Sequence, residues 1–112
     1  MRNYAVMSSA KFPLVDAREV LKKVGGGSFT RGKMLVDAGQ LSDLVWDSDA
    51  LKLSGTVFDD GVEVVADVTL VSDQSGFLIG EMSCGMDVEP GCKHVAALLI
   101  DSNARHMQAK DE

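Results

Sequence analysis

Both cysteines of the chain and one of its two histidines lie close together, at Cys84, Cys92 and His94. Thiolate and imidazole are ligands that suit zinc well when the fold brings them together. Residues i and i+2 of one helix do not face each other, so Cys92 and His94 converge only if Cys92 caps a helix and His94 lies in its first turn. Pro90-Gly91 supplies a turn just upstream, and an apolar stripe with helical spacing follows. The spacing therefore predicts a metal site, in which the helix N-terminus favours the thiolate form of Cys92.

The run Cys92-Lys93-His94-Val95-Ala96-Ala97-Leu98-Leu99 resembles the end of the SWIM zinc-finger motif, which reads Cys-x-Cys, a variable loop, then Cys-x-His. In this resemblance Cys84 matches the second cysteine of the family's first pair. The first cysteine falls on Met82, whose thioether is a poor zinc ligand. Weaker similarity at 29–33 and 39–41 extends the match over about residues 29–100. SWIM domains occur in bacterial Swi/Snf-type helicases, and the chain is similar to the N-terminal module of those enzymes.

The resemblance implies a zinc ion bound by Cys84, Cys92 and His94. One thiolate of the family set is missing, and Asp87 or Glu89 in the intervening loop is the candidate fourth ligand, because carboxylates also bind zinc. The second histidine, His106, would lie roughly 18 Å from His94 along a continuous helix, and we leave it out of the set unless the chain folds back. A disulfide between the two cysteines is the less favoured alternative, because residues 1–10 lack the apolar block of an export signal.

The net charge of −6 is unevenly distributed, with +5 over residues 1–33 and −11 over residues 34–112. Contacts to phosphate dominate affinity for nucleic acids, so an acidic domain is expected to bind them weakly. Four basic residues of the N-terminal third are the candidate contact residues: Lys22, Lys23, Arg31 and Lys33. No aromatic residues alternate with them as a stacking platform would require, which favours a solvated helix face. No apolar run approaches the roughly 20 residues that a membrane-spanning helix needs.

Length and composition favour one α+β domain over residues 1–112, with an apolar content of 46% that is sufficient for a single core. We expect two N-terminal helices, a three- to four-stranded antiparallel meander, a Cys/His knuckle and a C-terminal helix. The expected divisions are a loose arm (1–12), a helical region (13–39), antiparallel strands (41–83), the knuckle and helix (84–101) and a frayed tail (102–112).

Capping residues and glycines define the expected helices. Asp16 caps the first helix, and Glu19 has the spacing that closes a capping box. Gly25-Gly26-Gly27 is interpreted as a flexible linker, because it lacks the Gly-Lys-Ser/Thr sequence of a phosphate-binding loop. Ser28 is expected to cap the second helix, which Gly39 ends.

The expected strands follow from alternation of apolar and polar side chains, which is typical of a sheet covered on one face. A hairpin turn at Asp59-Asp60-Gly61 joins the two central strands. The strand ranges are 41–47, 51–58, 62–71 and 77–83.

Three side-chain placements follow from these elements. Met82 and Cys84 point to the same side of the last strand, where Met82 packs as a hydrophobic residue. The resemblance implies that Gly32 brings the second helix close to the sheet. The helical stripe of Val95, Leu98 and Leu99 is expected to pack on the apolar face of the sheet.

Three functional hypotheses remain. The first is a non-catalytic SWIM-like module that mediates protein or nucleic-acid contacts, as the N-terminal accessory region of a Swi/Snf-type helicase whose other domains, or another protein, are its partners. The second is a degenerate fold that has lost zinc and serves as a protein-interaction domain. The third is an enzyme with an open three-ligand zinc. The sequence disfavours this third hypothesis, because it shows no general base with a convincing partner and no zinc-deaminase motif. We therefore expect a cytoplasmic, non-enzymatic protein.

Overall fold

The computed structural model describes residues 12–74, 76–84 and 93–111. Its elements in chain order are α2 (Ala17–Val24), α3 (Gly26–Asp37), β1 (Leu41–Asp47), β2 (Lys52–Asp59), β3 (Val62–Asp73), β4 (Gly76–Cys84) and α4 (Lys93–Asp111). The expected α+β architecture of two N-terminal helices, an antiparallel meander and a C-terminal helix is confirmed, with four strands in the meander. The expected knuckle lies mostly outside the described residues.

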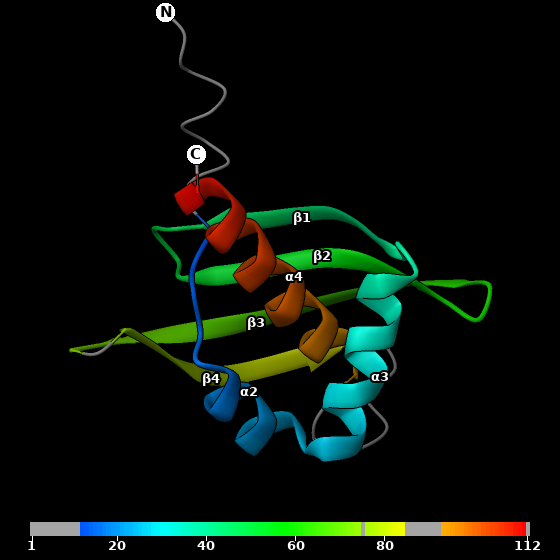
Figure 1. Cartoon of the computed structure of the whole chain (residues 1–112), viewed down its shortest axis with the longest axis horizontal. Coiled ribbons are helices and arrows are strands. Elements are labelled where there is room, and N and C mark those ends of the chain that lie inside the picture. The colour runs from blue at the N-terminus through cyan, green and yellow to red at the C-terminus, as the bar shows by residue number, and fades with distance from the viewer. Residues whose placement is uncertain (1–11, 75, 85–92, 112) are drawn as a thin grey trace, which may run out of the picture.

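The four strands form one antiparallel sheet in the order β1-β2-β3-β4, and α4 runs diagonally across one face of it (Figure 1). The strand register aligns inward-facing apolar residues in rows across the sheet, so that Leu53 of β2 pairs with Val68 of β3, and Val68 pairs with Met82 of β4. Apolar alternation predicted this arrangement because successive strand side chains point to opposite faces. The β2–β3 turn is the predicted hairpin, in which Asp60 and Gly61 adopt φ angles of 55° and 80°.

The predicted stripe on α4 lies in the core. Val95, Leu98 and Leu99 are fully buried, and they belong to the same cluster as the inward-facing strand residues. Gly55 in β2 leaves room for this helix, since a Cβ atom there would lie 2.8 Å from the Leu98 Cδ2 atom. Trp46 is half-buried against the core and meets Phe77 edge to face, with ring centroids 5.7 Å apart, as expected for a packing residue.

The triple glycine is not a linker. Gly25 alone, with φ of 89°, ends α2 by donating its N–H to the Leu21 carbonyl at 2.8 Å. Its own carbonyl accepts the Phe29 N–H at 2.9 Å and so opens α3. The second helix therefore begins at Gly26, and the predicted cap at Ser28 is wrong because Ser28 lies inside the helix. The C-terminal end of α3 is as predicted, with Gly39 at φ of 72° just beyond it.

Gly32 brings α3 close to α4, not to the sheet as the resemblance implied. A Cβ atom at Gly32 would lie 2.8 Å from both the Ala96 Cβ and the Ala97 backbone nitrogen, and 3.0 Å from the Lys93 carbonyl oxygen. Two of these three neighbours are backbone atoms. Only glycine allows the two helix axes to approach this closely.

The region beyond residue 101 is not a frayed tail, because α4 continues to Asp111. Its side chains hold residues 12–15, which precede the first helix; that helix begins at Ala17 and is capped, as predicted, by Asp16, whose Oδ1 accepts the Arg18 N–H at 2.8 Å. Ser102 Oγ donates to the Pro13 carbonyl at 2.8 Å, and Asn103 both donates to the Val15 carbonyl and accepts its N–H, at 2.7 and 2.9 Å. These contacts tie the start of the described chain to its last helix. Residues 1–11 of the expected loose arm (1–12) lie outside the described residues, and the carbonyl of Phe12 is bonded to His106 of α4.

None of the helices in the described parts of the chain is long and apolar enough to cross a membrane.

Candidate metal centre

Strand β4 and helix α4 flank the segment that carries the predicted ligands. Cys84 is the last residue of β4, where its backbone pairs with Ala66 of β3, and His94 is the second residue of α4. The side chain of Cys84, together with all of Cys92 and the candidate fourth ligands Asp87 and Glu89, lies outside the described residues. The predicted ligand set is therefore still a prediction.

His94 is held in a defined orientation within the core. Its side chain lies in the first turn of α4, as the spacing predicted, and the residue is only 3% exposed. Its Nε2 atom lies 2.8 Å from Oδ2 of Asp59, the last residue of β2. The same oxygen forms an ion pair with Lys93 Nζ at 3.0 Å. One carboxylate thus joins the β2–β3 hairpin to the start of α4.

The Asp59 carboxyl is ionised at neutral pH. The hydrogen bond from His94, followed by that from Lys93, lowers the pKa of Asp59 below its ordinary value of 3.8. An ionised carboxylate only accepts hydrogen bonds, so the imidazole Nε2 carries the hydrogen in this contact. In a neutral ring Nδ1 then carries the lone pair, and Nδ1 is the atom that would bind a metal ion.

A histidine bonded to a carboxylate through one ring nitrogen is the arrangement that supports metal ligation at the other nitrogen. The carboxylate fixes the tautomer and the ring orientation, and it makes the imidazole a better electron donor. The His94–Asp59 pair therefore fits a zinc ligand.

Sequence reasoning missed Asp59, which it treated only as part of a hairpin turn. The two partners are 35 residues apart, and a strand-end aspartate carries no local signal of a helix packed against it. The structure also separates the second histidine from this region of the fold. His106 Nδ1 donates to the Phe12 carbonyl at 2.8 Å, in the contact between α4 and residues 12–15. Within the described ranges, no three potential metal-ligating side chains are grouped together.

The four candidate nucleic-acid contacts are exposed on α2 and α3, but two of them form intramolecular ion pairs. Lys23 Nζ lies 3.1 Å from Glu19, and Lys33 Nζ lies 3.3 Å from Asp37. Each of these lysines already neutralises a neighbouring carboxylate. The arrangement disfavours a basic patch, and Lys23 is not simply solvated, because its Nζ also donates to the Ile79 carbonyl at 3.2 Å.

Comparison with known proteins finds no family model, no curated protein and no solved structure that matches this chain.

Proposed function

We propose that the chain is a non-catalytic, SWIM-like zinc-binding module. The observation that carries this proposal is the buried His94 held by Asp59, at the position where the motif-like run places a ligand. Cys84 and Cys92 supply the thiolates, and a loop carboxylate or water completes the set. A bound zinc would cross-link the end of β4 to the start of α4 and fix the loop between them as a contact surface.

The charge of the chain favours a protein over a nucleic acid as the target of such a module. Residues 34–112 carry a net charge of −11, which opposes binding to phosphates. The N-terminal accessory region of a Swi/Snf-type helicase, in contact with the other domains of that enzyme, is the context that the resemblance suggests.

A metal-free interaction domain is the second candidate, and the position of Met82 favours it. Met82 replaces the first cysteine of the motif and is half-buried against the hydrophobic core. A side chain packed in this way contributes to a core that needs no metal at this position.

Elemental analysis of protein purified without chelator distinguishes the two candidates. The zinc proposal requires one zinc per chain, its loss in Cys92→Ser and strong loss in His94→Gln. His106→Gln is the matched control and should retain full occupancy, because His106 is bonded to a backbone carbonyl elsewhere in the fold. Absence of zinc from the wild-type protein, even after incubation with the free ion, would leave only the metal-free candidate.

Asp59→Asn tests the carboxylate itself. Removing a carboxylate that orients a metal-bound histidine weakens metal affinity by about 10- to 100-fold. Asp60→Asn, one residue further along the same turn, should leave the affinity unchanged, because Asp59 supplies the oxygen bonded to His94 Nε2 and asparagine tolerates the positive φ at position 60.

A further inference from the structure

The two outer strands of the sheet, β1 and β4, differ in the charge they carry. β1 includes Asp43 and Asp47 among its seven residues. β4, with the sequence Gly-Phe-Leu-Ile-Gly-Glu-Met-Ser-Cys, carries a single charge at Glu81. Outer strands present backbone groups to which another chain can add a strand, and charged residues oppose such pairing. β4 is therefore the edge at which a second copy of this chain would pair most readily.

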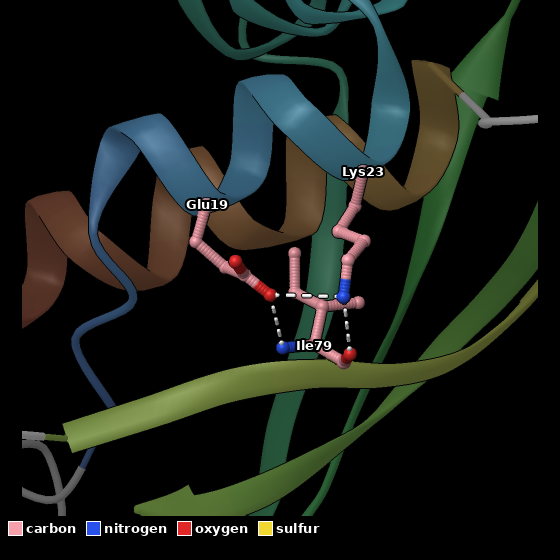
Figure 2. Close-up of polar contacts among 3 residues, drawn as sticks. All are labelled: Glu19, Lys23 and Ile79. Carbon is pink, nitrogen blue, oxygen red and sulfur yellow. Dashed lines mark hydrogen bonds and ion pairs between the residues drawn. The ribbon is translucent and has the colours of Figure 1, made fainter.

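Two side chains of helix α2 bond to backbone groups on that edge, as a neighbouring strand would. Glu19 Oε2 accepts the N–H of Ile79 at 3.0 Å, and Lys23 Nζ donates to the Ile79 carbonyl at 3.2 Å. Figure 2 shows both side chains reaching down from one face of α2 to the same residue of β4. The donor and the acceptor that a fifth strand would use at Ile79 are thus both satisfied from within the chain.

The Glu19 and Lys23 side chains also bind each other, with Oε2 and Nζ 3.1 Å apart. Residues at i and i+4 are neighbours on a helix face, so α2 presents the acceptor and the donor together. Immediately upstream, Val15 forms a parallel bridge with Phe77, so that the chain itself covers the edge from Phe77 to Ile79. Burial of Val20 and Val24 holds the helix in place above the strand.

The ionised form of Glu19 matches this role. The hydrogen bond from the Ile79 N–H, with smaller contributions from Lys23, lowers the pKa of the Glu19 carboxyl below its ordinary value of 4.5, although partial burial opposes the shift. The carboxylate, the lysine and the strand therefore form one contact in which every charge has a partner.

We propose that Glu19 and Lys23 form an edge cap, which prevents β4 from pairing with β4 of a second copy of this chain. The expected competing species is an antiparallel β4–β4 dimer. In that dimer the Ile79 N–H and carbonyl would bond to the second strand instead of to α2.

The double variant Glu19→Ala/Lys23→Ala tests the edge cap. Sedimentation velocity over a concentration series should show a monomeric wild type and concentration-dependent dimerisation of the variant. Amide hydrogen exchange at Ile79, measured by NMR at low concentration where the variant is monomeric, should accelerate at least about tenfold, because the N–H loses its acceptor.

The matched control is Lys33→Ala/Asp37→Ala. This second i,i+4 ion pair is exposed on α3 and has a similar distance of 3.3 Å. It should leave both the oligomeric state and the Ile79 exchange rate unchanged. Glu19→Gln keeps an oxygen that can accept the Ile79 N–H, and it should remain monomeric.

Adding Leu78→Lys to the double variant identifies the surface that pairs. Leu78 lies on the open face of β4, 41% exposed and opposite Val71. Two copies of this lysine in a β4–β4 dimer would repel each other and restore the monomer. If the double variant does not fold, Glu19→Ala alone provides the same test.

Three results would overturn the proposal. The first is a wild type that already dimerises through β4. The second is a folded variant that stays monomeric and keeps the wild-type exchange rate at Ile79. The third is a dimer that persists after Leu78→Lys, which would mean that the copies associate through another surface.

Discussion

Asp59 Oδ2 and His94 Nε2 lie 2.8 Å apart, and this contact joins the end of β2 to the first turn of α4. The aspartate is followed directly by the hairpin, and the histidine is followed by the buried stripe of α4. The contact therefore sets where the helix begins relative to the sheet, and it orients the imidazole whether or not a metal ion is present.

Replacing Asp59 should destabilise the fold. Asp59→Ala leaves the buried His94 N–H without its acceptor and removes the ion pair with Lys93, and we expect a loss of about 1–3 kcal/mol. Asp59→Asn keeps an acceptor oxygen and should lose less. Urea unfolding of these variants and of the Asp60→Asn control gives the measurement. A loss below about 0.5 kcal/mol for Asp59→Ala, which is typical of surface sites, would contradict the assigned role.

The strands and their pairing could be predicted from the sequence because each signal is local. Alternation at 51–58 and 62–71 defines two half-buried strands, and Asp60-Gly61 supplies the positive φ angles that the hairpin needs. β1 follows the predicted 41–47 range, and the ends of the other strands lie within two residues of their predicted positions.

The long-range contacts could not be predicted in this way. Glu19 has the spacing of a capping box, but its carboxylate bonds to Ile79, which is 60 residues away. Asn103 bonds to Val15 across 88 residues, and such contacts hold the region that was expected to fray. Helix α3 likewise contains several glycines of low helix propensity, and its Gly32 packs directly against α4. This long-range packing outweighs the local propensity. The loop part of the predicted metal site, at 85–92, lies outside the described residues.

Acid should weaken the Glu19 contact, and the sign follows from its pKa. A carboxyl whose folded pKa is lowered contributes stability above its ordinary value of 4.5, and this contribution is lost as the pH falls through the folded pKa. The free-energy advantage of wild type over Glu19→Gln should therefore be constant near neutral pH and shrink below pH 4.5. An NMR titration of the Ile79 amide should show a midpoint below 4.5. A midpoint at or above that value would contradict the lowered pKa.

Gly32→Ala should destabilise the protein, although alanine favours helices over glycine by about 1 kcal/mol. The new methyl group would lie 2.8 Å from a backbone nitrogen of α4, and α3 would have to move away. We expect a net loss of about 1–3 kcal/mol. Gly27→Ala in the same helix meets nothing within 4 Å, and it should be neutral or stabilising. Equal thermal midpoints for the two variants would show that the close approach of the helices is unimportant.

Leu98→Ala should remove a central part of the core. Leu98 is fully buried and lies against Gly55 of β2, so the truncation leaves a cavity and should cost about 2–5 kcal/mol. Met107→Ala, on the exposed side of the same helix, is the control and should change stability by less than about 0.5 kcal/mol. Denaturant unfolding of both variants distinguishes packing from helix propensity. A small loss for Leu98→Ala would mean that α4 contributes little to the core.

Removing any bound zinc should leave the described fold intact. Structural zinc supplies the folding energy where a domain has little core of its own, as in small zinc fingers. Here the buried cluster extends over all four strands, α2 and α4, and His94, the one predicted ligand whose side chain the structure describes, is not among its members. His94 is also held by Asp59 without a metal. We therefore expect a chelator to leave the far-ultraviolet circular dichroism unchanged. The thermal midpoint should shift by no more than about 5 °C, which is roughly what 1 kcal/mol produces in a domain of this size. Cys92→Ser should fold equally well. Global unfolding on chelation would instead mean that the site is closed by four protein ligands, and that the loss of the first cysteine at Met82 has been compensated within the chain.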